Sequence, residues 1–284
     1  SGRRRCCCCG LRWARCCAEE IVPDGPARGT PWPVLFAFPS FWLRLLRRLG
    51  GAGLDLVFPP RCAGCGRPGP AWCPRCRQSV HRWPRRSCAL CGGRDLHRRS
   101  CPAAVADVPL RTYAVYRGPV ARALVLLKYR PERQIAETMA GWLADLVQEE
   151  GWRPDVVLPV PLGARRAKGR GYNQVALVAK ALAERLCAVH LPEALIRTRE
   201  TRSQVGLNPS QRRRNVAGAF HARREQVAGR RVLVIDDLST SGATLLACAR
   251  ALQAASAERV FGASLARPSN DPFAQSNDRR EGET

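Results

Sequence analysis

The segment VLVIDDLSTSGAT, residues 232–244, combines residue types that suit the binding of a sugar phosphate. Four apolar residues predict a buried strand, and Asp236 and Asp237 follow at its carboxyl end, where ligands bind in open α/β sheets. Small hydroxyl residues and a glycine then precede the next predicted helix: Thr240, Ser241, Gly242 and Thr244. The free N–H groups and partial positive charge of a helix amino terminus suit a phosphate monoester. The two carboxylates would then contact sugar hydroxyls or Mg²⁺.

Two other interpretations of this segment are weaker. A strand end with Ser/Thr helix caps and solvated acids would explain one hydroxyl, but not two acids and three hydroxyls around a glycine. A nucleoside triphosphate loop of the Walker type would need a lysine, and the segment has none. The pattern therefore favours sugar-phosphate chemistry.

Fifteen cysteines occur in the chain, and their spacing favours metal knuckles over a disulfide scaffold. Two CxxC pairs offer the four thiolates that a tetrahedral structural zinc site needs: Cys62, Cys65, Cys73 and Cys76. Redox thiols are the alternative. A second unit comprises Cys88, Cys91 and Cys101, but Ala104 stands where its fourth cysteine would be. His97 could complete a Cys3His zinc site, or packing could hold this unit without metal.

The cysteine-rich segment is also basic. Residues 61–100 hold ten arginines and a single acid, Asp95, with Trp72, Trp83 and His81 interleaved. Cations beside ring faces suit single-stranded nucleic acid, although the tryptophans could equally form the core of a small zinc module. Over the whole chain, 47 Lys and Arg against 23 Asp and Glu give a formal charge of +24. This balance indicates either polyanionic partners or an arginine-rich genomic composition.

The elements that must position the Asp236 segment alternate between strand and helix patterns. Strands are predicted at residues 110–116, 156–160, 231–235 and 260–265, and helices at 119–129, 132–149, 175–186 and 243–254. Cys187 and Cys248 are expected inside helices as core residues. Such alternation predicts an α/β fold with a parallel sheet covered on both faces.

Composition divides the chain into five segments. We expect a disordered or non-native extension (1–40), an amphipathic helix and linker (41–60), a single or double zinc ribbon (61–106), the α/β domain (107–267) and a disordered tail (268–284). The most apolar stretch, 32–49, is interrupted by prolines and arginines, so no membrane span is expected. No secretory leader is evident, and the expected location is the cytoplasm.

VLVIDDLSTSGAT resembles the motif by which type I phosphoribosyltransferases bind phosphoribosyl pyrophosphate (PRPP). The chain more closely resembles the ComF family of competence-associated proteins, over residues 41–267. The likeness includes LVFPPRCAGCG at the start of the cysteine ribbon and LKYRPER at 127–133. It also includes PVPLGARRAKGRGYNQ at 159–174 and RTRETRSQVGLNPSQRRRNVAGAF at 197–220. The resemblance implies a parallel-sheet type I phosphoribosyltransferase fold with an N-terminal zinc ribbon.

The resemblance also implies roles for individual residues. Asp236 and Asp237 would face the ribose hydroxyls as the catalytic acids. The 5′-phosphate would bind to Thr240, Ser241, Gly242, Ala243 and Thr244. Pyrophosphate would bind in the loop after Val160, at Pro161, Arg165, Arg166 and Arg170. Further phosphate contacts would come from Lys128 and Arg202, whereas no role is implied for Tyr172, Asn173 and Gln174.

Three functions are consistent with these residues. The first is transfer of ribose 5-phosphate from PRPP, with Mg²⁺, to an unidentified acceptor, linked to DNA uptake. Carboxylates would stabilise oxocarbenium character, while Mg²⁺ and arginines would neutralise the leaving pyrophosphate. The second is a PRPP sensor without chemistry, whose basic ribbon binds single-stranded DNA during natural competence. The third is an adaptor that recruits helicase or recombination proteins through the ribbon.

Overall fold

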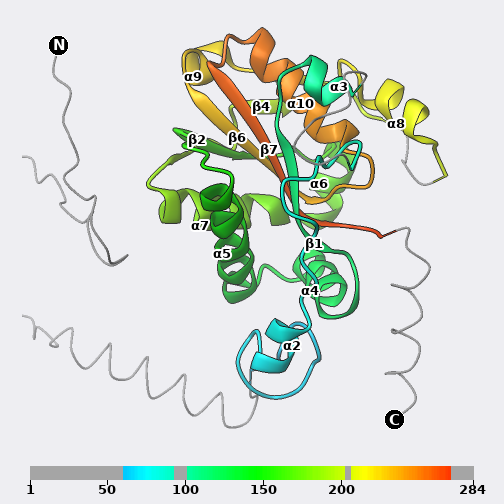
Figure 1. Ribbon diagram of the computed structural model, residues 1–284, viewed down its shortest axis with the longest axis vertical. Coiled ribbons are helices and arrows are strands. Elements are labelled where there is room, and N and C mark those ends of the chain that lie inside the picture. The colour runs from blue at the N-terminus through cyan, green and yellow to red at the C-terminus, as the bar shows by residue number, and fades with distance from the viewer. Residues whose placement is uncertain (1–59, 93–100, 202–205, 270–284) are drawn as a thin grey trace, which may run out of the picture. The chain divides into compact units, whose positions relative to one another are not determined.

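The computed structural model is built around a five-stranded parallel sheet (Figure 1). The strands lie in the order β1-β7-β6-β2-β3. Their bounds are Leu110–Val115 (β1), Val156–Pro159 (β2), Val189–His190 (β3), Arg231–Leu238 (β6) and Arg259–Arg267 (β7). The predicted parallel α/β fold is confirmed. The last strand, β7, lies between β1 and β6, so it is inside the sheet and pairs on both sides.

Helices cover both faces of the sheet, as predicted. They are α4 (Gly118–Tyr129), α5 (Arg133–Glu149), α7 (Gln174–Leu186) and α10 (Ala243–Ala254). Side chains alternate along β6, so Val232 and Val234 join the core that contains α10. Leu233 and Ile235 join the opposite core, which contains α5 and α7. The four-residue apolar run at 232–235 is therefore buried from both sides.

The structure describes residues 60–92, 101–201 and 206–269, which belong to the unit Gly53–Thr284. The extension expected at 1–40, nearly all of the segment expected at 41–60 and the tail from residue 270 lie outside the described residues. No helix within the described ranges is both long enough and apolar enough to span a bilayer.

Shorter elements complete the α/β domain around the sheet. They are α6 (Ala164–Arg170), α8 (Pro209–Val216), α9 (Arg224–Val227) and the antiparallel pair β4 (Leu195–Arg197) and β5 (Phe220–Ala222). The helix α6 replaces a predicted loop. It buries none of its residues, so no apolar periodicity could reveal it. Cys248 is buried as expected, but Cys187 is exposed at the left-handed C-cap of α7, so its assignment to the core was wrong.

The ribbon (residues 60–92) lies along the free edge of β1 and contains the helix α2 (Pro74–Gln78). Three backbone hydrogen bonds of 2.8 Å join the two segments: Trp83 N to Tyr113 O, Val115 N to His81 O, and Ala89 N to Leu110 O. The ribbon thus covers groups of an edge strand that would otherwise be unpaired. The short helix α3 (Pro102–Val105) follows Cys101 and leads toward β1.

The tryptophan Trp72 belongs to the hydrophobic core. It is 4% exposed, and its ring meets that of Trp142 edge-on with the centroids 5.0 Å apart. Arg82 of the ribbon also reaches α5, where it pairs with Glu149 at 2.8 Å. The packing interpretation of Trp72 is therefore confirmed, and the base-stacking interpretation is wrong for this residue.

Candidate active site and metal centres

A cavity of about 450 Å³ lies beyond the carboxyl ends of β2 and β6. Its predicted lining residues are Lys128, Pro161, Arg166, Arg170, Asp236, Asp237, Thr240 and Thr244. Residues that were not predicted to bind a ligand complete the polar wall: Gln174, Arg197 and Arg212. The fold therefore brings the two acids, two hydroxyl residues and five cationic side chains to one cavity.

The other predicted residues are placed differently. Ser241 and Ala243 are buried behind the cavity wall, at 8% and 3% exposure. Arg165 lines a neighbouring cavity rather than this one. Arg202 lies outside the described residues.

The hydroxyl loop (residues 239–244) joins β6 to α10 through a left-handed glycine. Gly242 has φ +65° and forms the N-cap of α10. Its amide donates to Ser239 Oγ at 3.1 Å, and its carbonyl accepts from Leu246 N at 3.0 Å. The N–H groups of the first helical turn have no carbonyl partner within the helix and point toward its amino end. This geometry suits an anion at the end of the cavity that Thr240 and Thr244 line.

The two acids occupy different electrostatic environments. Asp236 Oδ1 accepts a hydrogen bond from the Asp237 amide at 2.9 Å. Burial, together with the negative charge of Asp237, raises the pKa of Asp236 well above its usual range. Asp237 Oδ2 accepts from Gln174 Nε2 at 2.7 Å and lies 3.8 Å from Lys128 Nζ. Ionised Asp236 would therefore be stabilised by a cation or by positive charge that develops on a ligand.

The segment 172–174, for which no role was predicted, supports the walls of the cavity. The Tyr172 hydroxyl donates to the Leu127 carbonyl at 2.7 Å. Asn173 caps α7 and donates to the carbonyl of Val160 at 3.0 Å. Both contacts join backbone segments that are distant in the sequence, so no local pattern could have indicated them.

Gln174 links the two sides of the cavity. Its side chain donates to Asp237 at the end of β6 and accepts from Arg170 at the end of α6. The residue is only 3% exposed. A glutamine is suited to this position because its amide can donate to an acid and accept from a cation at the same time.

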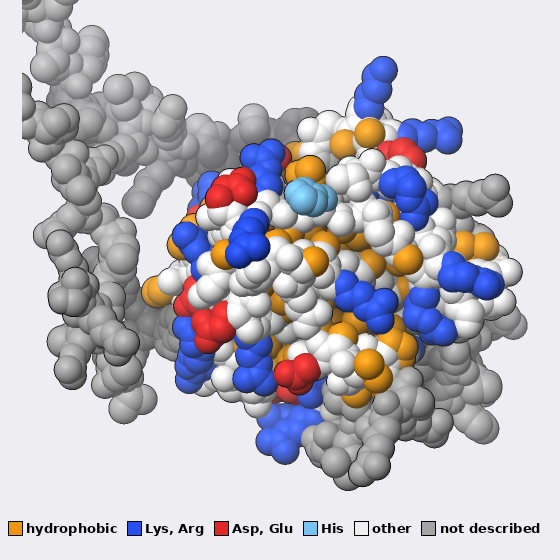
Figure 2. Space-filling model, turned by 90° about the horizontal axis from the view of Figure 1, so that it is seen from above, with side chains coloured by type: hydrophobic (Ala, Val, Ile, Leu, Met, Phe, Trp, Pro, Cys, Tyr) orange, Lys and Arg blue, Asp and Glu red, His pale blue; other side chains and the backbone are white. Residues whose placement is uncertain are grey.

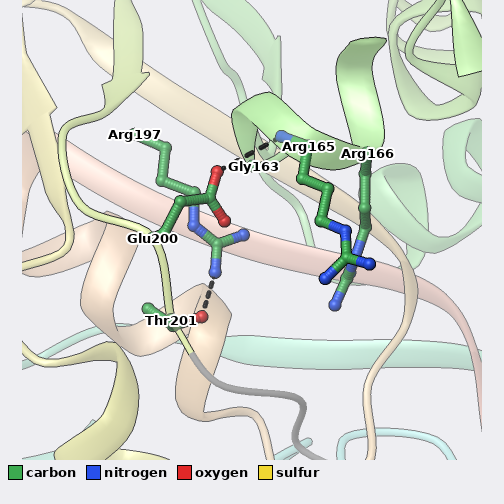
Figure 3. Close-up of a pocket in the computed structure, with 6 residues that line it drawn as sticks. All are labelled: Gly163, Arg165, Arg166, Arg197, Glu200 and Thr201. Atoms are coloured by element: carbon green, nitrogen blue, oxygen red, sulfur yellow. Dashed lines mark hydrogen bonds between the residues drawn. The ribbon is translucent and has the colours of Figure 1, made fainter. Parts of the chain in front are cut away.

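A second cavity, of about 420 Å³, adjoins the first and shares Arg166 and Arg197 with it. Figure 3 shows Glu200 between the Arg197 side chain and the start of α6. Glu200 Oε1 accepts from the Arg165 amide at 3.4 Å, and Arg197 donates to the Thr201 hydroxyl. Burial, followed by the charge of Arg166, lowers the pKa of Arg197. A carboxylate of the chain thus lies among cations that an anionic ligand would also contact.

Positive charge is spread over the surface of the α/β domain. On the face seen in Figure 2, Lys and Arg side chains are dispersed, with acidic side chains among some of them. That face shows no single basic patch.

The first cysteine cluster fits a tetrahedral metal ion. The sulfurs of Cys62, Cys65, Cys73 and Cys76 all lie within 4.8 Å of one another. The Cys65 and Cys73 sulfurs are 3.9 Å apart, close to the S–S edge of about 3.8 Å that Zn–S bonds of about 2.3 Å give in a tetrahedron. The Cys73 amide donates to Cys62 Sγ at 3.3 Å, which favours the thiolate. The four predicted ligands are thus brought together.

The second cysteine cluster contributes three sulfurs. Those of Cys88, Cys91 and Cys101 lie within 4.8 Å of one another. The predicted fourth ligand, His97, lies outside the described residues. The two clusters share one backbone turn: the amides of Gly66 and Gly92 donate to the carbonyls of Cys62 and Cys88, at 2.7 and 2.9 Å. The same turn around a second set of thiols supports a second metal site.

Comparisons with known proteins agree with this architecture. Residues 128–282 match the family model described as Phosphoribosyl transferase domain, and residues 53–105 match that described as Double zinc ribbon domain. The chain is 34% identical over 148 residues to the DNA utilization protein YhgH of Escherichia coli O157:H7, and this alignment covers 50% of this chain and 65% of that protein. It is 28% identical over 207 residues to Competence protein F of Haemophilus influenzae, and this alignment covers 69% of this chain and 90% of that protein.

Among solved structures, the orotate phosphoribosyltransferase of Mycobacterium tuberculosis H37Rv in complex with PRPP aligns at 20% identity. The alignment covers 58% of this chain and 75% of that one, with a TM-score of 0.30. The family matches and the cysteine clusters support structural zinc in the ribbon. Since the phosphoribosyl transferase match covers more than half of the sequence and a double zinc ribbon precedes it, the chain belongs to the ComF family of phosphoribosyltransferase-fold proteins.

Proposed function

We propose that this protein binds PRPP in the cavity at the end of β6 and transfers its ribose 5-phosphate to an acceptor, with release of pyrophosphate. The observation that carries the proposal is the convergence of Asp236, Asp237 and the hydroxyl loop on one cavity with five cationic side chains. Sugar hydroxyls suit the acids, and phosphoryl groups suit the hydroxyls and cations. Cysteine clusters arranged for metal binding suit a reducing compartment, so the cytoplasm is the proposed location.

The two ends of the cavity would bind different parts of PRPP. Thr240 and Thr244, with the amides of the hydroxyl loop, would hold the 5′-phosphate, and Ser241, Gly242 and Ala243 would form the backbone of that cradle. Arg166 and Arg170 would hold the pyrophosphate, with Pro161 forming the wall beside them. As the anomeric bond breaks, positive charge develops on the ribose, and the carboxylates of Asp236 and Asp237 would stabilise it.

Magnesium would bind with PRPP. Oxygen ligands are what Mg²⁺ prefers, and the two carboxylates at the end of β6 are the protein groups in this cavity that fit it. A divalent cation would offset the burial and the negative charge of Asp237 that raise the pKa of Asp236, and it would neutralise charge on the leaving pyrophosphate. Asp237 already has Gln174 and Lys128 beside it, so Asp236 is the better candidate for a metal contact.

A second candidate function is binding of single-stranded DNA by the ribbon, with PRPP acting as a regulatory ligand. Within residues 60–92 there are seven arginines and no acid. Arg67, Arg75 and Arg77 are exposed there, and no ion pair involves them among the described residues. Arg82 and Arg85 are poorer candidates, because both reach Glu149. The names of the relatives, Competence protein F and DNA utilization protein YhgH, link this proposal to DNA uptake.

Calorimetric titration with PRPP and Mg²⁺, followed by a pyrophosphate-release assay, tests the first proposal. The wild type should bind one PRPP, and Asp236→Asn should abolish binding. Release of pyrophosphate in the presence of an acceptor supports transfer, whereas binding without release across a panel of acceptors supports a sensor. If the wild type binds no PRPP, the proposal fails.

Fluorescence anisotropy with a labelled single strand tests the second proposal. Replacing Arg67, Arg75 and Arg77 by alanine should weaken binding and reduce the slope of its salt dependence by about one for each phosphate that the variant no longer neutralises. The matched control replaces three exposed arginines of the α/β domain: Arg223, Arg224 and Arg250. Equal decreases in affinity for both triple variants would mean that only net charge matters.

A further inference from the structure

The second cysteine cluster packs directly on the hydroxyl loop. A Cβ atom added to Gly242 would lie 3.0 Å from Leu90 Cδ1, 3.1 Å from Leu90 Cα and 3.2 Å from the Ala89 carbonyl oxygen. The loop therefore packs against the Leu90 side chain, which is the nearest of the three, as well as against the backbone of residues 89 and 90. Gly242 is also the N-cap of α10. The position of Leu90 therefore limits the conformations open to the loop.

The turn that carries Leu90 is fixed by the sheet on one side and by a metal ligand on the other. The Ala89 amide donates to Leu110 O at 2.8 Å, and the Arg267 guanidinium donates to the Ala89 carbonyl. The Leu90 amide donates to Cys88 Sγ at 3.3 Å. Cys88 and Ala89 are both 0% exposed. A metal held by Cys88 would thus fix the same turn that touches the loop.

The first cysteine cluster has no such contact among the residues that the structure describes. Gly64 occupies the position in the first CxxC turn that Leu90 occupies in the second. An added Cβ there would lie 2.8 Å from Pro119 Cβ, at the start of α4, and Arg122 of α4 donates to the Gly64 carbonyl. The two clusters also belong to separate hydrophobic cores, on opposite faces of the sheet. The first cluster therefore attaches the ribbon to α4, and the second abuts the hydroxyl loop.

We infer that Leu90 is a positioning residue for the hydroxyl loop, and that the second cysteine cluster, through Leu90, sets the affinity of the loop for a phosphorylated ligand. When the metal is removed from Cys88, Cys91 and Cys101, the turn relaxes, the restraint on Gly242 weakens and the first turn of α10 becomes mobile. The part of this inference that concerns affinity rests on the proposed function of the loop. It gives the two cysteine clusters different roles.

Three full-length variants test the inference. Leu90→Ala keeps every cysteine and removes the side-chain contact. Cys91→Ser removes a ligand of the second cluster, and Cys65→Ser is the matched change in the first. For each we would measure zinc content, the affinity for PRPP with Mg²⁺ by calorimetry, and hydrogen exchange of the peptide that covers residues 239–246.

Leu90→Ala and Cys91→Ser should each weaken PRPP binding about tenfold and speed exchange of the loop peptide, and Cys65→Ser should change both by less than about twofold. Leu90→Ala should keep its zinc. Unchanged affinity and exchange in Leu90→Ala would overturn the inference, as would equal effects of Cys65→Ser and Cys91→Ser. If the wild type binds no PRPP, the proposed function fails. In that case hydrogen exchange of the loop peptide alone tests the positioning role of Leu90. Faster exchange in Leu90→Ala and Cys91→Ser, but not in Cys65→Ser, still supports that role.

Discussion

Replacing Gln174 should disturb the acids of the cavity without removing a charge from it. The Gln174 side chain is 3% exposed. It donates to Asp237 Oδ2 at 2.7 Å and accepts from Arg170, so it joins the carboxylate that would contact ribose to a cation that would contact pyrophosphate. Gln174→Ala removes both hydrogen bonds, so that Asp237 and Arg170 can replace them only with hydrogen bonds to water.

The size of the effect follows from these hydrogen bonds. A hydrogen bond to a charged group contributes about 1.5–3 kcal/mol. Lys128 lies 3.8 Å from the same oxygen of Asp237, and water can enter the emptied space, so we expect a decrease of about 2–3 kcal/mol in the free energy of unfolding for both bonds together. Because Asp237 is then no longer held toward the ligand, the Kd for PRPP should rise about tenfold, equivalent to about 1.4 kcal/mol.

Urea denaturation measures the first quantity and calorimetry the second, and Gln174→Glu separates positioning from packing. Glutamate preserves the volume and the acceptor for Arg170, but it places a second negative charge beside Asp237. PRPP should therefore bind more weakly to Gln174→Glu than to Gln174→Ala. A purely structural role predicts the reverse order. Wild-type affinity in both variants would refute the reasoning.

Three further substitutions test single interactions. Burial and the charge of Asp237 raise the folded-state pKa of Asp236, so ionisation of this side chain lowers the stability as pH rises from the unfolded pKa near 3.8 through the folded pKa. Asp236→Asn should therefore raise the melting temperature at pH 8 while abolishing PRPP binding, and an unchanged pH dependence of the melting temperature would contradict this. Glu200→Gln removes a carboxylate that accepts from the Arg165 amide, so pyrophosphate should bind about two- to fivefold more tightly in a calorimetric titration, and weaker binding would count against it. Gly242→Ala places a side chain at φ +65° and 3.0 Å from Leu90, which should lower the free energy of unfolding by about 1–2 kcal/mol or more in urea, and wild-type stability would show that the contact is absent.

The sheet could be predicted from sequence because its strands are apolar runs. Residues 232–235 are buried from both faces, and the amphipathic helices that cover them follow helical spacing. The helix α6 has no buried residue, and β4 and β5 contain only three residues each, so neither carries a periodic signal. The strand order could not be predicted from the sequence either, since the place of β7 between β1 and β6 depends on long-range pairing.

The candidate site was predicted only as far as contiguous segments could show it. Asp236 and the hydroxyl loop share one segment, and the four ligands of the first cysteine cluster share another. The partner of Asp237, Gln174, is 63 residues away, and Glu149, the partner of Arg82, is 67 residues away. Such contacts form only when the helices pack on the sheet. For the same reason, the arginines of the ribbon could not be divided into paired and solvent-exposed ones from sequence.

The measurement that tests the central claim most directly is a crystal structure of the full chain with PRPP and Mg²⁺. We predict that the 5′-phosphate lies within hydrogen-bonding distance of the Thr240 and Thr244 hydroxyls and that the ribose hydroxyls face Asp236 and Asp237. Density for PRPP outside this cavity, or in the cavity with its ribose turned away from both acids, would contradict this claim.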